Sequence, residues 1–231
     1  MRSIALLIMS LSLFVSKDKD IFSSKAIENR MVKVSAGLYS NKFETTNAEY
    51  HKFLEWAKEH KAGILNEVDV RHNGWTKINR EVYAKNYFTN KGFDNYPVVN
   101  ITYEAANEFC SWLTHRYNQL KKKKFQEVKF RLPTKAEWID MASNGKFHPQ
   151  FYPWGSPYLQ NKDGHYLANF LRVGNQNLKV DIDDRSKIEL QSAKDGGTGP
   201  SVIMSKVNSY PATGAGLHNL SGNVAEMLAQ K

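Results

Sequence analysis

The sequence predicts an α+β domain with few helices, small sheets and much irregular backbone. Three segments combine a helix-capping residue with apolar side chains at helical spacing, and one run alternates apolar and polar residues as a strand does. Most of the other residues among the 231 show no regular period. With 41% apolar and 12% aromatic residues the chain can bury a core, and its length suits one large domain or two small ones.

The predicted strand is Met31–Gly37, which alternates apolar and polar side chains and ends in glycine. Residues 38–43 are predicted to pair with it as a hairpin. Phe130–Pro133 is predicted to be extended because proline pushes the residue before it out of the helical region. Residues 96–101 are expected to be short and extended, and short strands are expected at 206–211 and 216–220.

The three predicted helices begin at threonine residues. Thr46 with Glu49 and Thr134 with Glu137 have the spacing of a capping box, in which the two side chains bind each other's backbone amides. Thr102 is expected to cap the helix between them. The predicted helices span about 46–60, 102–120 and 134–143.

The segments outside these elements are predicted to be irregular. Residues 64–96 read as an insertion pinned by scattered aromatic side chains, and Tyr152–Gly155 as a rigid aromatic turn. Such a domain is held by buried aromatics and turn chemistry, and often by a bound metal.

The N-terminus is predicted to be a signal peptide at residues 1–16, followed by a polar leader at 17–30 and a domain at 31–231. One basic residue precedes a dozen mostly apolar ones and a charged break, which is typical of such peptides. The alternative is an apolar first strand or helix. We therefore expect a secreted, periplasmic or cell-envelope protein, and no other segment suits a membrane span.

The net charge of +9 is concentrated in one stretch. Residues 114–135 carry eight basic side chains and one acidic one, with Lys121–Lys124 at the centre. Such a patch could bind an anionic surface, or it could be the solvated end of a helix, whose dipole lysines complement. No nucleic-acid-binding motif accompanies it, so a nucleic-acid partner is not expected.

The single cysteine, Cys110, limits the chemistry of the chain. It excludes an internal disulfide, a cysteine-based zinc module and any catalysis that needs two cysteines in one chain. Cys110 lies on the apolar face of a predicted helix and is expected to behave as a small hydrophobe. No hydrolase, phosphate-loop or dinucleotide motif is present, so no catalytic or cofactor-binding residue is predicted.

Oxygen-bearing residues in the C-terminal third suggest a different kind of site. Asn169, Asp195, Asn223 and Glu226 occur in loop-like contexts, and Asp181, Asp183 and Asp184 form an acidic cluster. Calcium prefers six to eight oxygen ligands on irregular chain. Spacing alone leaves a calcium site and ordinary solvated loops both open.

Five segments, taken in order, resemble the formylglycine-generating enzyme (sulfatase-modifying factor) family from about Met31 to the end of the chain. The segments are Met31–Gly37 with Glu44–Tyr50, Pro97–Leu113, Arg131–Trp138, Tyr152–Gly155 with Ala168–Phe170, and Gly216–Met227. Among them, Arg-Leu-Pro-Thr-x-Ala-Glu-Trp and Gly-Asn-Val-x-Glu are the most specific.

The resemblance implies a variant of the C-type lectin fold with calcium bound by loop residues. The ligands it implies are Asn169, the carbonyl of Phe170, Asp195, Asn223, the carbonyl of Val224, and Glu226. Asp195 depends on a loop that differs in length from the family pattern.

The departures from the family bear on activity. Catalytic members oxidise a substrate cysteine to formylglycine with oxygen and a copper ion held by two cysteines, which follow the Gly-Asn-Val-x-Glu segment. This sequence stops at Lys231 and carries Ala225 where many members have tryptophan. Cys110 matches a structural helix position, so copper is not expected in this chain.

The expected function is therefore that of a non-catalytic, calcium-stabilised, sulfatase-modifying-factor-like domain that binds an unknown protein or glycan or has a structural role. The end at Lys231 fits a fragment, a truncated product or a naturally short relative. One alternative is a formylglycine-generating oxidase, if a longer product supplies the cysteine pair. Another is a carbohydrate-binding or envelope adhesion module.

Overall fold

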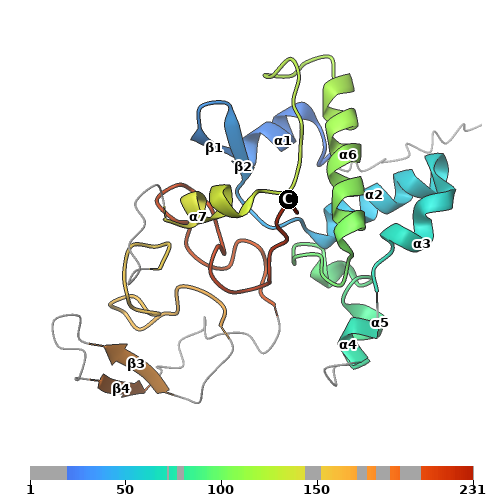
Figure 1. Cartoon of the computed structure of the whole chain (residues 1–231). Coiled ribbons are helices and arrows are strands. Elements are labelled where there is room, and N and C mark those ends of the chain that lie inside the picture. The colour runs from blue at the N-terminus through green and yellow to red at the C-terminus, as the bar shows by residue number, and fades with distance from the viewer. Residues whose placement is uncertain are drawn as a thin grey trace, which may run out of the picture.

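The computed structural model describes residues 20–71, 73–76, 81–143, 152–170, 176–180, 188–192 and 204–230, and these form an α+β fold (Figure 1). The predicted signal peptide, Asp195 and the acidic cluster at 181–184 lie outside the described residues. The elements are α1 (Ser24–Asn29), β1 (Met31–Ser35), β2 (Leu38–Asn41), α2 (Asn47–His60), η1 (Ala62–Ile64), α3 (Leu65–Val68), α4 (Asn73–Thr76), α5 (Glu81–Asn86), η2 (Lys91–Phe93), α6 (Tyr103–Gln119), α7 (Lys135–Ser143), β3 (Gln176–Val180) and β4 (Ile188–Ser192).

The three helices expected from the sequence are α2, α6 and α7, and their predicted caps are confirmed. Thr46 accepts a hydrogen bond from the amide of Glu49, whose carboxylate accepts one from the amide of Thr46 at 2.8 Å. Thr134 and Glu137 make the same exchange at the start of α7. Thr102 caps α6 by accepting from the amide of Ala105 at 3.0 Å.

The predicted hairpin is confirmed, whereas the short strands predicted at 206–211 and 216–220 are wrong. β1 pairs with β2 in antiparallel register, and Gly37 takes a positive φ of 73° in the turn. The segments 206–211 and 216–220 contain no strand, because their amides bond singly to scattered carbonyls. For example, the amide of His218 donates to Lys42 O at 2.9 Å. The segment 96–101, predicted to be extended, forms an isolated antiparallel bridge between Pro97 and Thr46. The antiparallel pair of β3 and β4 was not expected.

The stretch 64–96 is more helical than the sequence indicates. Residues 64–96, predicted to be irregular, contain the short helices α3, α4 and α5 and the turn η2. The predicted aromatic pinning is confirmed, since the ring of Tyr87 lies 5.0 Å from that of Trp75 and 5.1 Å from that of Phe93. Helices this short are marginal alone and depend on such packing.

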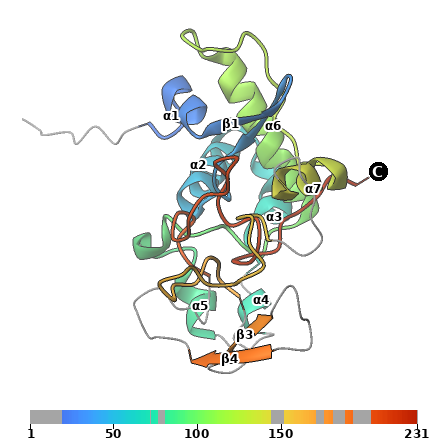
Figure 2. The same cartoon turned by 90° about the vertical axis from the view of Figure 1, so that its left-hand side faces the viewer.

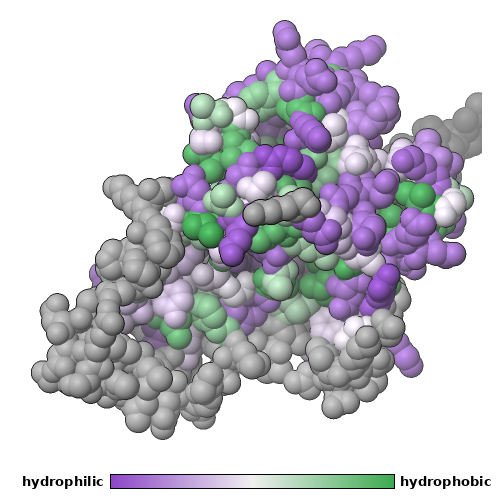
Figure 3. Space-filling model, in the orientation of Figure 1, coloured by the Kyte–Doolittle hydropathy of each residue, from purple (hydrophilic) through white to green (hydrophobic). Residues whose placement is uncertain are grey.

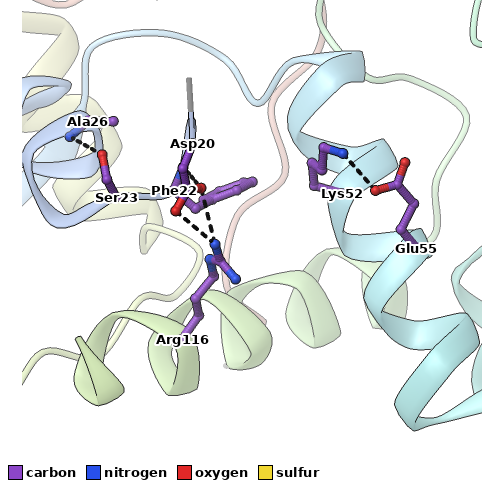
Figure 4. A network of polar contacts seen from close by, with 7 residues as sticks. All are labelled: Asp20, Phe22, Ser23, Ala26, Lys52, Glu55 and Arg116. Atoms are coloured by element: carbon purple, nitrogen blue, oxygen red, sulfur yellow. Dashed lines mark hydrogen bonds and ion pairs between the residues drawn. The ribbon is translucent and has the colours of Figure 1, made fainter. Parts of the chain in front are cut away.

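The helix α1 lies in the predicted polar leader. Its first turn is capped by Ser23, which accepts from the amide of Ala26 at 3.4 Å (Figure 4). Arg116 of α6 donates to both carboxylate oxygens of Asp20, at 3.1 and 3.3 Å, and its guanidinium lies 5.6 Å from the ring centre of Phe22. The ion pair is exposed and stabilises little, but the Phe22 side chain is buried and binds the segment to α6.

The main core lies between α2 and α6 and is largely aromatic. Phe53 is fully buried, with its ring 5.7 Å from Phe109 and 5.5 Å from Trp112. Phe22 meets Trp112 edge to face at 4.8 Å. Burying one such side chain stabilises the fold by about 1.5–3 kcal/mol, so this cluster fixes how the two helices cross.

A smaller apolar cluster holds the C-terminal segment. Met141 of α7 packs with Leu217 and Leu220, and Val32 and Val34 of β1 pack against them. The segment 204–230 therefore runs beside the β1–β2 hairpin and α7, as the two views show (Figures 1 and 2). No helix in the described part of the chain is both long enough and apolar enough to span a bilayer.

Candidate metal centre and the cleft beside it

Two segments that the sequence analysis singled out lie against each other. The amide of Asn223 donates to the carbonyl of Asn169 at 2.8 Å. The preceding Gly222 has a φ of 87°, and a Cβ there would lie 2.4 Å from the same carbonyl oxygen. Only glycine permits both the backbone angle and this close approach.

The side chain of Asn223 is fully engaged in hydrogen bonds. Its Oδ1 accepts from the amide of Ser205 at 2.7 Å and from Asn169 Nδ2 at 3.4 Å. Its Nδ2 donates to one carboxylate oxygen of Glu44 at 2.8 Å. The oxygen predicted as a metal ligand thus already accepts two donors.

Asn219 was not among the predicted ligands, yet it occupies the centre of this network. The residue is 6% exposed and has a φ of 56°. Its Nδ2 donates to the second oxygen of Glu44 at 2.8 Å and to the carbonyl of Val207 at 3.1 Å. Its Oδ1 is buried without a hydrogen-bond partner. The one sequence signal was its place in the Gly216–Met227 segment, four residues before Asn223.

Glu44, from the N-terminal part of the chain, accepts hydrogen bonds from both Asn219 and Asn223. It follows β2, and each of its oxygens accepts from one asparagine amide. Burial raises the pKa of this carboxyl, and the hydrogen bonds from Asn223 and Asn219 oppose the rise. No ion pair to Glu44 is present among the described residues.

Glu226 lies three residues beyond Asn223 and turns toward α7. Its carboxylate accepts a hydrogen bond from Nε1 of Trp138. The residue is exposed and borders a cleft that is described below. The pKa of the Glu226 carboxyl is raised to about 7, mainly by loss of hydration. The hydrogen bond from Trp138 opposes this rise, and the charge of Glu44 adds to it.

The other predicted ligands are placed as follows. Val224 lies between Asn223 and Glu226 and borders the same cleft. Phe170 follows Asn169, and its ring lies 5.9 Å from Tyr152 and 6.2 Å from Trp154 of the aromatic turn. The turn is confirmed, because the amide of Gly155 donates to Tyr152 O at 2.8 Å. Within the described ranges, no three His, Cys, Asp or Glu side chains gather around one point.

The donor atoms of this network suit calcium. They are amide, carbonyl and carboxylate oxygens on irregular chain, which are the ligands that this hard cation prefers. The buried Oδ1 of Asn219 is a second, independent indication, because a polar atom without a partner is costly unless something binds it. The residues present therefore fit the ion that the sequence resemblance implies.

A cleft with a volume of about 1180 Å³ adjoins the network. Its walls come from the β1–β2 hairpin, α6, the extended segment 125–133, α7 and the C-terminal segment, and apolar side chains predominate. Figure 3 shows hydrophobic side chains lying among hydrophilic ones on this side of the molecule. A cleft of this size and character can hold a small molecule or an extended peptide.

Cys110 of α6 borders the cleft and is half-buried. Burial raises the pKa of its thiol to about 11, so almost no reactive thiolate forms near neutral pH. This agrees with the prediction that Cys110 acts as a small hydrophobe.

The basic patch lies at the end of α6 and is partly used within the fold. Lys123 donates from Nζ to the carbonyl of Asn118 near the end of that helix, and its ammonium lies 5.8 Å from the ring centre of Tyr117. Lys121 and Lys122 are exposed. Hydrophilic side chains cover this end of the molecule (Figure 3), as a solvated helix end requires.

Comparison with known proteins places this architecture in a family. Residues 16–231 match the model of the sulfatase-modifying factor enzyme 1-like domain. The chain therefore belongs to the sulfatase-modifying factor family, and the resemblance read from its motifs is confirmed.

Several curated proteins resemble the chain individually. Formylglycine-generating enzyme of Mus musculus is 26% identical, over 82% of this chain and 48% of that protein. Inactive C-alpha-formylglycine-generating enzyme 2 of Bos taurus is 28% identical, over 59% and 33%. Formylglycine-generating enzyme of Thermomonospora curvata is 28% identical, over 58% and 33%. The chain spans about half the length, or less, of these relatives.

Proposed function

We propose that this chain forms a calcium-stabilised, lectin-like sulfatase-modifying-factor domain of an exported protein, with a binding or structural role and no oxidase activity of its own. The observation that carries the proposal is the oxygen-rich network around the partnerless Oδ1 of Asn219. The residues that would hold calcium there are Asn219 and Glu226 through their side chains and Val224 through its carbonyl.

The second predicted group of ligands extends the proposal. Asn169 lies directly against Asn223, Phe170 follows it in the chain, and Asp195 is proposed to complete their set. Bound calcium would supply positive charge near the carboxylates of Glu44 and Glu226. It would fix the C-terminal segment against the hairpin and thereby keep the cleft in shape.

The absence of catalysis is supported by the thiol chemistry of the sequence. Formylglycine generation in the family uses two cysteines to hold copper, whereas these 231 residues contain one. The thiol of Cys110 is largely protonated near neutral pH. Two of the similar proteins, from Bos taurus and Mus musculus, carry the word inactive in their names, so proteins with such names occur among the relatives.

The apolar cleft is the feature that favours a binding role. We propose that it receives a protein or glycan partner outside the cytoplasm, consistent with the predicted signal peptide. The alternative function is formylglycine generation on sulfatases, which the names of the relatives from Mus musculus and Thermomonospora curvata favour. That activity requires a longer product that supplies the cysteine pair.

Thermal unfolding with millimolar calcium and with EGTA tests the proposal. A cation that binds only the folded state stabilises it by about 2.7 kcal/mol at a hundredfold excess over Kd, so calcium should raise the Tm by several degrees. Asn219→Ala and Glu226→Gln should remove most of this difference. Asn208→Ala, a change at an exposed asparagine of the same segment, should leave it intact. Identical unfolding curves with calcium and EGTA would overturn the proposal.

A further inference from the structure

Glu44 lies remote in sequence from the proposed ligands but in direct contact with them. The residue is separated from Asn219 by 175 positions and from Asn223 by 179. Two contacts hold it there: the amide of His218 donates to Lys42 O at 2.9 Å, and the ring of Phe43 lies 4.7 Å from that of His218. The residues directly before Glu44 and directly before Asn219 are thus fixed to each other.

The chemistry of a carboxylate dictates how the two amides are oriented. An ionised carboxylate only accepts hydrogen bonds, so each asparagine must present its Nδ2 to Glu44. The Oδ1 of each asparagine therefore points elsewhere. For Asn223 that oxygen accepts from Ser205, whereas for Asn219 it is left without a partner.

We infer that Glu44 is a positioning residue for the proposed calcium site: it orients the Asn219 amide so that Oδ1 remains available to the ion. The inference rests on the proposed function. It also explains why a half-buried carboxylate is kept where no described lysine or arginine pairs with it. In the calcium-free protein that charge is a cost, and in the bound protein it lies close to the cation.

Replacing Glu44 by glutamine separates this role from a purely structural one. The glutamine amide has donors as well as an acceptor, so Asn219 can rotate and let its Oδ1 accept from the new side chain. The calcium-free protein then loses a half-buried, unpaired charge and gains a partner for the Oδ1 of Asn219, so its Tm in EGTA should stay the same or rise. Calcium affinity should fall, because the Oδ1 of Asn219 would then face the new glutamine side chain instead of the ion.

The experiment is calorimetric titration of the full chain with calcium chloride, together with unfolding in EGTA. Glu44→Gln should weaken calcium binding about 10–100-fold, as other losses of a residue behind a metal ligand do. Glu127→Gln, which neutralises an exposed carboxylate beside the same cleft, should bind calcium like the unmodified protein. Glu44→Asp keeps the charge and both acceptor oxygens, and should bind more tightly than Glu44→Gln.

The outcomes distinguish the positioning role of Glu44 from the calcium site on which it rests. If the unmodified protein binds calcium and Glu44→Gln binds it equally well, the positioning role is wrong and the calcium site stands. If Glu44→Gln lowers the Tm equally in EGTA and in calcium, Glu44 is merely structural. If the unmodified protein does not bind calcium, the proposed function itself fails.

Discussion

The space between α2 and α6 is filled by aromatic rings, whereas the space between the C-terminal segment and the hairpin is crossed by hydrogen bonds. Phe53 in the first region is fully buried, and its ring packs against the rings of Phe109 and Trp112. Asn219 in the second region is almost as buried. Its Nδ2 donates to a carboxylate and a carbonyl, whereas its Oδ1 has no hydrogen-bond partner. The aromatic core is closed by contacts among its own side chains, whereas the polar region leaves the Oδ1 of Asn219 without a partner, which the proposed calcium ion would supply.

The largest loss of stability is expected in the aromatic core. Phe53→Ala removes a buried ring and leaves a cavity, which should lower the free energy of unfolding by about 3–5 kcal/mol. Because no metal ligand is involved, urea unfolding should give the same loss in calcium and in EGTA. Lys52→Ala, at the exposed neighbouring position, should change little. A loss that depended on calcium would show that the two regions are not separate.

The second prediction concerns the contact between Gly222 and Asn169. Ala at position 222 meets both a positive φ and a carbonyl oxygen 2.4 Å from its Cβ. Gly37 also has a positive φ but nothing within 4 Å, so Gly37→Ala is the matched control and should cost about 1 kcal/mol.

Gly222→Ala should cost about 1–3 kcal/mol more than the control, because the carbonyl must move to admit the methyl group. It should also reduce the response to calcium, since the movement separates the two asparagine segments. Chemical denaturation of both variants measures the difference. Equal losses of stability would show that the close approach is relaxed in solution.

The smallest effect on stability is expected at Cys110, where the measurement is chemical. Its pKa is raised to about 11 from an ordinary value near 9, and only the thiolate reacts with iodoacetamide. At pH 8 alkylation of the folded protein should be about 100-fold slower than that of the urea-unfolded protein, since two pKa units separate them. The folded-state rate should keep rising with pH up to about 11. Equal rates at pH 8 would mean that the helix face is open to solvent.

The local elements of this protein could be predicted from the sequence because their causes are local. The capping boxes at Thr46 and Thr134 need only residues three positions apart, and the hairpin needs only alternation and Gly37. The family motifs likewise lie on short continuous segments. The same reasoning gave the helices α2, α6 and α7, and it placed Cys110 on an apolar face.

The elements that were missed or misplaced depend on distant partners. The segments 206–211 and 216–220 have the composition of strands, but the chain offers them single carbonyls instead of a neighbouring strand. The short helices α3, α4 and α5 have weak signals of their own, and rings such as Tyr87 and Trp75 pack across them. Helix propensity over so few residues is too small to decide the outcome.

The features of the candidate site also divide into those with local causes and those that depend on distant partners. The sequence by itself determined that oxygen-bearing residues cluster in the C-terminal third and that only one thiol is present. The tertiary structure alone showed that Asn219 is buried with a partnerless oxygen and that Glu44 faces it across 175 residues. Which amide oxygen is available depends on what its nitrogen contacts, and that contact is made only when the two ends of the chain fold together.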